Sequence, residues 1–100
     1  MIIKKLSIEN TVKVGNATYN HSKLLEELME LGEVLVKKIN KIPEKQPPIE
    51  KIIEEMGDVL VRVYVLMYQE NIEKEVKDRI SEKLEMLHKY AKEGKYKGGV

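Results

Sequence analysis

Apolar residues recur every three or four positions along three stretches of the chain, the spacing that places them on one face of an α-helix. The first helix predicted in this way covers about residues 22–39, and the second covers about residues 49–68. Asn71 predicts a short turn, after which a third amphipathic helix covers residues 72–91. Three such helices in a chain of 100 residues predict an all-α fold, a helical bundle.

Proline-rich and aperiodic segments separate and flank these helices. Residues 42–48 (IPEKQPP) contain all three prolines and predict a stiff connector that folds the first two helices into an antiparallel hairpin. Residues 1–20 predict an irregular arm or a short β segment, with a short helix as the alternative. We expect residues 21–92 to form the helical domain and residues 93–100 to be a flexible tail.

The second predicted helix is apolar around nearly its whole circumference from Val59 onward. A helix of this kind is buried on several sides, whereas a chain of this length can build only a small core. We therefore expect oligomerisation to complete the bundle.

Composition narrows the possible function classes. The chain has 18 Lys+Arg and 17 Asp+Glu, so its net charge of +1 gives no field that favours nucleic acid or an anionic membrane. It contains no Cys, which excludes a disulfide scaffold, a thiolate zinc site and a cysteine nucleophile. The most apolar run, residues 59–68, is too short to span a bilayer and includes Arg62, and the N-terminus does not predict a signal peptide. We expect a soluble, cytoplasmic protein.

Acidic residues gather on one face of each of the first two predicted helices. The first helix contains EELME at residues 26–30 and the second contains EEMGD at residues 54–58. At about 100° per residue, the three acids of each motif share a face. The acids concerned are Glu26, Glu27 and Glu30 on the first helix and Glu54, Glu55 and Asp58 on the second.

The antiparallel hairpin would bring these two acidic faces to the same level. Glu30 and Asp58 each lie roughly 14 Å from the proline connector, so up to six carboxylates could converge. Carboxylates in a partly dry groove repel one another and must be protonated or neutralised by a cation. Oxygen ligands favour Mg²⁺ or Mn²⁺, and the only two histidines, His21 and His88, are too far apart for a zinc site. The alternative is that these acids are the solvated faces of two amphipathic helices.

This two-part pattern resembles the signature of the MazG-like all-α nucleoside triphosphate pyrophosphohydrolases. The similarity consists of EExxE followed by ExxD, with 24 residues between Glu30 and Glu55, and it extends over about residues 20–90. The surrounding segments KLLEELMELGEVL and IIEEMGDVLV are similar too. The resemblance implies a helical bundle, assembled as a homodimer or homotetramer, that uses Mg²⁺ to hydrolyse a nucleoside triphosphate to the monophosphate and pyrophosphate.

The resemblance also implies roles for individual residues. The implied metal ligands are Glu27, Glu30, Glu55 and Asp58. Glu26 matches the first acid of the motif and would bind a second metal or orient the attacking water. Lys83 is the nearest positional match to the basic residues that the family uses against phosphates, followed by Arg62 and Arg79. Arg62 could instead pair with a motif carboxylate or with a partner subunit.

The residues that would bind a nucleobase are not identified by the pattern. Asn20 and His21 lie near the predicted start of the first helix, where they could cap the helix, lie exposed or approach a base. The chain contains no Ser–His or Cys–His arrangement and no Walker-type glycine loop. Two other functions fit the same acids: a phosphoribosyl-ATP pyrophosphohydrolase, which attacks the same kind of bond, and a non-catalytic helical assembly or metal-binding module.

Overall fold

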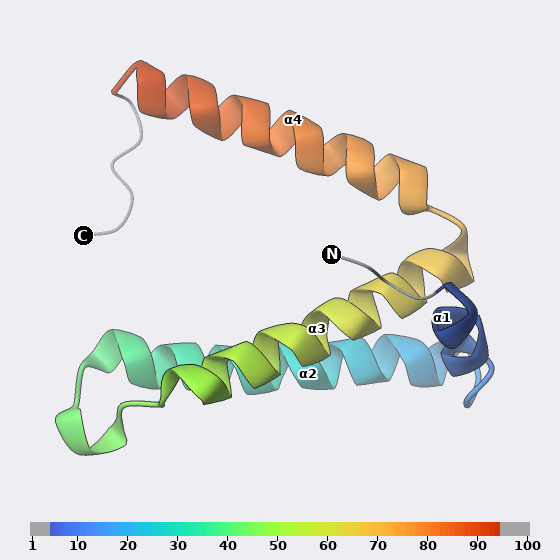
Figure 1. Cartoon of the computed structure of the whole chain (residues 1–100), viewed down its shortest axis with the longest axis horizontal. Helices are drawn as coiled ribbons and strands as arrows, with labels where there is room; N and C mark the ends of the chain where they lie inside the picture. The colour runs from blue at the N-terminus through green and yellow to red at the C-terminus, as the bar shows by residue number, and fades with distance from the viewer. Residues whose placement is uncertain (1–4, 95–100) are drawn as a thin grey trace.

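Helices make up all the regular structure of residues 5–94, the part of the chain that the computed structural model describes (Figure 1). The elements in chain order are α1 (Lys5–Val12), α2 (Ala17–Asn40), the 3₁₀ turn η1 (Pro43–Lys45), α3 (Ile49–Glu70) and α4 (Glu73–Lys92). The prediction of an all-α fold is therefore confirmed. The tail that we expected to be flexible lies, apart from residues 93 and 94, outside the described residues.

The N-terminal segment is helical, so the prediction of an irregular or β-structured segment is wrong over residues 5–12. The helix predicted to start near residue 22 also starts earlier, at Ala17. The side chain of Asn16 caps it by accepting a hydrogen bond of 2.8 Å from the backbone N–H of Tyr19. Gly15, whose φ is 77°, reverses the chain between α1 and α2. Residues other than glycine rarely adopt this backbone conformation.

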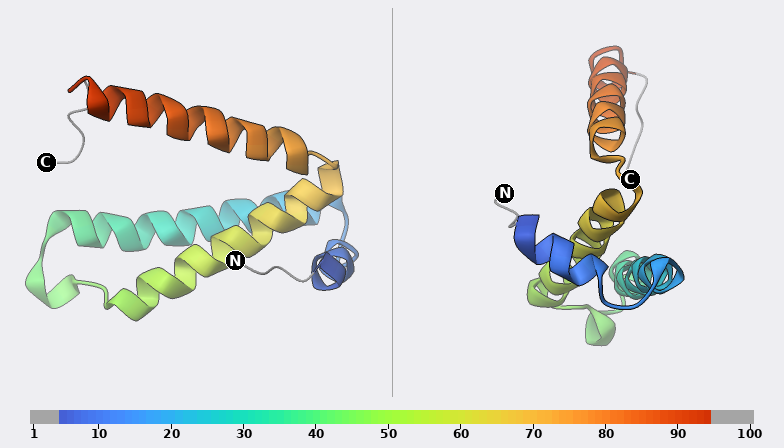
Figure 2. Two further views of the ribbon diagram at one scale, coloured as in Figure 1. Left: turned by 45° about the horizontal axis from the view of Figure 1, so that its top comes forward. Right: turned by 90° about the vertical axis from the view of Figure 1, so that its right-hand side faces the viewer.

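An antiparallel hairpin of α2 and α3 forms the main body of the molecule, with α1 packed across α3 at the open end (Figures 1 and 2). At its closed end, α2 stops where Lys41 adopts a left-handed conformation, and Pro48 directly precedes α3. The side-chain amide of Gln46 donates a hydrogen bond of 3.1 Å to the backbone carbonyl of Lys37. The predicted proline connector thus closes the hairpin and is held against the end of α2.

The apolar core of the described residues is small. Its buried apolar side chains are Val34, Val59, Val65 and Met67. The chain exposes 8117 Å², whereas a compact monomer of 11.6 kDa would expose about 5,800 Å². Its radius of gyration is 16.5 Å, against about 13 Å for a compact domain of this length. A single chain therefore leaves much of its apolar surface uncovered.

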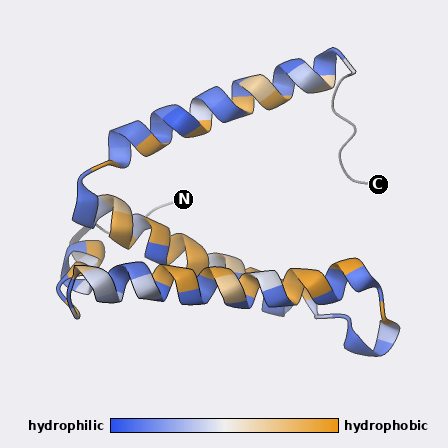
Figure 3. Ribbon diagram, turned by 180° about the vertical axis from the view of Figure 1, so that it is seen from behind, coloured by the Kyte–Doolittle hydropathy of each residue, from blue (hydrophilic) through white to orange (hydrophobic). Residues whose placement is uncertain are grey.

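The fourth helix runs apart from the hairpin after the turn at Asn71, whose φ is 55° (Figure 1). Its apolar positions have no covering layer within the described residues: Ile80 and Leu84 are 52% and 61% exposed. Hydrophobic positions recur along all three long helices, α4 included (Figure 3). None of the helices of residues 5–94 has the length and apolarity needed to cross a membrane.

Candidate metal centre

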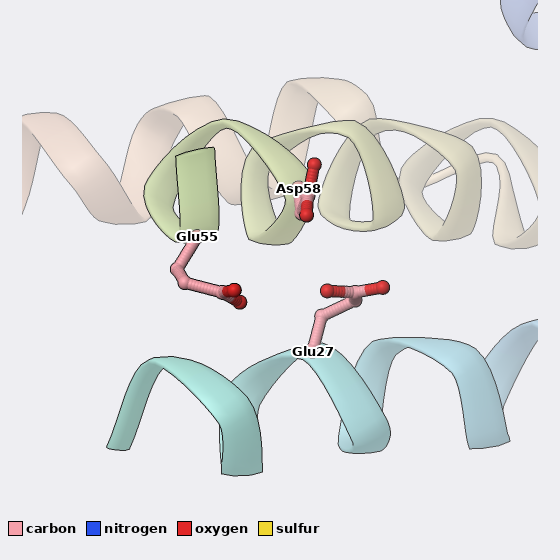
Figure 4. Close-up of side chains that lie close together, drawn as sticks. All are labelled: Glu27, Glu55 and Asp58. Carbon is pink, nitrogen blue, oxygen red and sulfur yellow. The ribbon is translucent and has the colours of Figure 1, made fainter. Parts of the chain in front are cut away.

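Three carboxylates come close together at the hairpin: Glu27 from α2 and Glu55 from α3 extend into the space between the helices, and Asp58 lies beside them on α3 (Figure 4). One oxygen of each lies within 4.8 Å of one oxygen of each of the others. Ligand oxygens on opposite sides of a Mg²⁺ ion are about 4.2 Å apart, since each lies at 2.0–2.1 Å from the metal. Small side-chain movements would therefore bring these three oxygens to coordination distance.

The local sequence explains why these acids face each other. Glu27 lies one turn from each of Leu24 and Leu31, which are half-buried, and Glu55 lies one turn before the buried Val59. Both acids thus occupy positions on the contact face of the hairpin that apolar residues occupy in the neighbouring turns. This placement brings carboxylates into the layer between the two helices.

Burial leaves two of the carboxylate oxygens without a partner. Glu55 is 3% exposed and Glu27 is half-buried, whereas Asp58 is exposed. Within the described residues, the Oε2 atoms of Glu27 and Glu55 are buried and form no hydrogen bond. A buried carboxylate oxygen without a donor is costly, so this geometry fits a site for a cation. The three oxygen ligands suit Mg²⁺ or Mn²⁺.

The charges around the cluster are only partly balanced. Nζ of Lys51 lies 2.9 Å from Oε1 of Glu55 and 3.6 Å from Oε2 of the exposed Glu54. The hydrogen bond to Glu55 and the charge of Glu54 raise the pKa of Lys51. Near the cluster, the charge of Glu27 raises the pKa of Glu30 above its ordinary value of 4.5, with smaller contributions from burial and from Glu55. The site therefore holds more negative charge than the nearby lysine offsets.

The six acids predicted to converge separate into three groups. Glu27, Glu55 and Asp58 form the cluster, and Glu30 lies close enough to be affected by its charge. Glu54 is on the solvent side of α3, with its side chain 61% exposed. Glu26 is also exposed, and its Oε2 lies 3.0 Å from Nζ of Lys23. Of the up to six acids that could converge, three therefore meet, because Glu26 and Glu54 turn toward solvent and toward lysines.

The open end of the hairpin is held by Asn20, which is 1% exposed. Its Nδ2 donates hydrogen bonds of 2.7 Å to Oε1 of Gln69 on α3 and 3.1 Å to the carbonyl of Val12 at the end of α1. Asn20 is thus an interior residue that ties three helices together, and it does not cap α2. His21 is exposed, and its Nε2 lies 3.2 Å from Oε1 of Glu70.

The basic residues expected at the phosphates do not share one location. Arg62 lies on α3 one turn after Asp58 and is half-buried. It forms no ion pair or hydrogen bond with any residue that the structure describes, so the alternative of an ion pair with a motif carboxylate is wrong within the chain. Lys83 and Arg79 lie on α4, apart from the hairpin (Figure 1), and Arg79 pairs with Glu82 at 3.3 Å. A single chain does not bring these two residues to the cluster.

Two lysines next to the acids were not identified from the sequence. Lys51 pairs with Glu55 four residues later, and Lys23 pairs with Glu26 three residues later. The spacing was a usable signal, because residues three or four apart are neighbours on a helix.

Comparison with known proteins adds no relative: no family model matches the chain, and neither the curated proteins nor the solved structures include a match. The MazG-like resemblance therefore rests on the motif residues and their spacing.

Proposed function

We propose that this protein is a Mg²⁺-dependent nucleoside triphosphate pyrophosphohydrolase of the MazG-like kind. One observation supports the proposal above the others: acids from two helices meet within 4.8 Å, and buried oxygens of Glu27 and Glu55 have no partner among the described residues. Acids that were only the solvated faces of amphipathic helices would point outward and would be satisfied by water or lysine.

In this proposal Glu27, Glu55 and Asp58 hold the divalent cation, and Glu30 becomes a fourth ligand after a change of side-chain rotamer. A cation held there would offset the charge of the triphosphate oxygens and lower the pKa of a water molecule. Water attacks the α-phosphorus, the bond between that phosphorus and the bridging oxygen breaks, and pyrophosphate leaves. Glu26 is exposed beside the cluster, where it would orient the attacking water or contribute to a second metal site.

We also propose that the active form is a homodimer or homotetramer. Taking Glu27 as zero, Glu30 lies about 60° to one side on α2, and Leu28, Leu35 and Ile39 lie about 80–120° round in the opposite direction. The corresponding residues of α3 are Asp58, also about 60° from Glu55, and Ile53, Met56 and Leu60, about 100–160° round in the opposite direction. All six of these apolar side chains are exposed.

The two apolar faces lie on one side of the hairpin, because similar rotations in the same sense from the contact face of antiparallel helices lead to the same side. A second copy packed there would cover apolar surface away from the acids. The chain as a whole, α4 included, exposes about 2,300 Å² more than a compact monomer, an area in the range of permanent subunit interfaces. A partner's α4 could then bring the equivalents of Lys83 and Arg79 to the site, which the chain alone does not do.

Release of pyrophosphate from a panel of nucleotides, measured with and without Mg²⁺, tests the proposed activity. The panel includes phosphoribosyl-ATP, so that the two kinds of pyrophosphohydrolase are distinguished. Glu27→Gln and Asp58→Asn should lose the Mg²⁺-dependent activity, whereas Glu54→Gln should retain it because Glu54 faces solvent. If no nucleotide is hydrolysed, the enzymatic proposal is wrong and the helical assembly module is the better description.

A further inference from the structure

Two cationic side chains come together on the hairpin beside the carboxylate cluster. Lys23 precedes Glu27 by one turn of α2, and Arg62 follows Asp58 by one turn of α3. The hydrogen bond between Asn20 and Gln69 fixes the register of the open end of the hairpin. In this antiparallel arrangement, both cations lie between that hydrogen bond and the carboxylate cluster.

Lys23 is held in place before any ligand arrives. Its Nζ lies 3.0 Å from Glu26 and 6.0 Å from the centroid of the Tyr19 ring, and its side chain is 26% exposed. The hydrogen bond to Glu26 raises the pKa of Lys23, so the ammonium is charged at neutral pH, whereas the charge of Arg62 lowers that pKa. The ammonium group has three N–H donors, so it can bind Glu26 and an anion together.

Arg62 is the less satisfied of the two cations. Its guanidinium has five N–H donors, yet it forms no hydrogen bond or ion pair with the described residues, although it is half-buried and Asp58 is only one turn away. A partly buried charge without a partner is unfavourable, and a second positive charge beside it adds repulsion. An anion bound between Lys23 and Arg62 would remove both costs.

We propose that Lys23 and Arg62 form an anion subsite that binds a phosphate group of a phosphoanhydride ligand next to the carboxylate cluster. Each cation lies about 6 Å along its helix from the nearest cluster acid, so a ligand with adjacent phosphates can contact both the cation pair and a metal ion on the acids. This inference rests on the proposed function for the identity of the ligand. The two positive side chains are the residues of this chain that would fix where the ligand's negative charge lies.

Calorimetric titration with inorganic pyrophosphate, in millimolar Mg²⁺ and again in a chelator, tests the subsite on the full chain. Lys23→Met and Arg62→Met keep the apolar part of each side chain and should each weaken binding about tenfold or more. Arg62→Lys keeps the charge and should lose less. Lys74→Met is the matched control, because Lys74 is also paired with an acid, Asp78 at 2.8 Å, but lies on α4. Far-UV circular dichroism and light scattering check the fold and the oligomeric state of every variant.

Each outcome bears on the subsite or on the hydrolase separately. The subsite is wrong if wild-type protein does not bind pyrophosphate, or if both methionine variants bind it as tightly as wild type does. If pyrophosphate binding depends on both cations while no nucleotide is hydrolysed, the subsite stands and the hydrolase proposal fails. If nucleotides are hydrolysed and neither variant changes kcat/KM, the hydrolase stands and the subsite fails. Parallel titrations with orthophosphate and with a nucleoside triphosphate show whether one phosphate group suffices.

Discussion

Replacing Glu27 with glutamine should stabilise the metal-free protein, because Glu27 has acidic neighbours but no cationic partner among the described residues. One carboxylate oxygen of Glu27 lies within 4.8 Å of an oxygen of Glu55 and of Asp58, and its Oε2 is buried without a hydrogen bond. Glutamine keeps the shape of the side chain and removes its charge. If Glu27 were only part of a solvated helix face, the same change would leave stability within about 0.5 kcal/mol.

The geometry sets the size of the expected effect. Two unit charges 4.8 Å apart repel by about 3.5 kcal/mol at an effective dielectric constant of 20. Asp58 is exposed, so solvent screens part of its repulsion, and we expect Glu27→Gln to gain about 1–2 kcal/mol in all. For a chain of this length this corresponds to a rise in Tm of roughly 5–10 °C. Mg²⁺ at ten times its Kd would stabilise wild type by about 1.4 kcal/mol, and the variant should lose that gain.

Thermal unfolding followed by circular dichroism at pH 7.5, with and without Mg²⁺ and at one protein concentration, measures both effects. Glu33→Gln is the matched control, since Glu33 is an exposed acid of the same helix outside the cluster. It should show the Tm and the Mg²⁺ response of wild type. A lower metal-free Tm for Glu27→Gln, or a full Mg²⁺ response in that variant, would refute the reasoning.

Two further predictions concern pH and association. The raised pKa of Glu30 means that the folded chain holds a proton there more tightly than the unfolded chain, so metal-free stability should fall as the pH rises from about 4.5 through the raised pKa. Urea unfolding across that pH range should show a shallower fall for Glu30→Gln, and an unchanged slope would exclude Glu30 as the cause. Met56→Glu, on the exposed apolar face, should reduce the molar mass measured by light scattering toward 11.6 kDa, whereas Glu33→Gln, at an exposed acid on the opposite side of the hairpin, should not. An unchanged mass for Met56→Glu would place the interface elsewhere.

The long helices and the connector could be predicted because their signals are local. Three prolines in seven residues cannot continue a helix, and the apolar period extends over many turns in α2, α3 and α4. The N-terminal segment could not be predicted, because α1 has only eight residues, too few to separate a helical period from a strand. The start of α2 was predicted too late because Asn20 was a possible cap, whereas the cap of this helix is Asn16. Tertiary contacts with Gln69 and Val12 hold Asn20 in the interior.

Helical geometry predicted which acids share a face, but the crossing of the helices decides which of them meet. Glu27, Glu55 and Asp58 come together, as the motif suggested. Glu26 and Glu54 fall on the same broad arcs, yet each lies toward its outer edge, where solvent and a lysine are within reach. Angles measured along one helix do not give the distance between two helices, so the difference between three carboxylates and six could not be derived from the sequence.

The candidate site and the exposed apolar face are connected through the stability of the hairpin. Glu27 and Glu55 occupy contact positions where apolar residues would have enlarged a core that has few buried side chains. The chain therefore gives up packing between α2 and α3 at the place where the acids meet, and the exposed apolar face that includes Met56 lies on the other side of the hairpin. Binding a cation would relieve repulsion on one side, and binding a second copy would bury apolar area on the other. Both events favour the folded hairpin over the unfolded chain, so each should raise the apparent stability. The stabilisation by Mg²⁺ should persist in Met56→Glu, and the self-association should persist in Glu27→Gln.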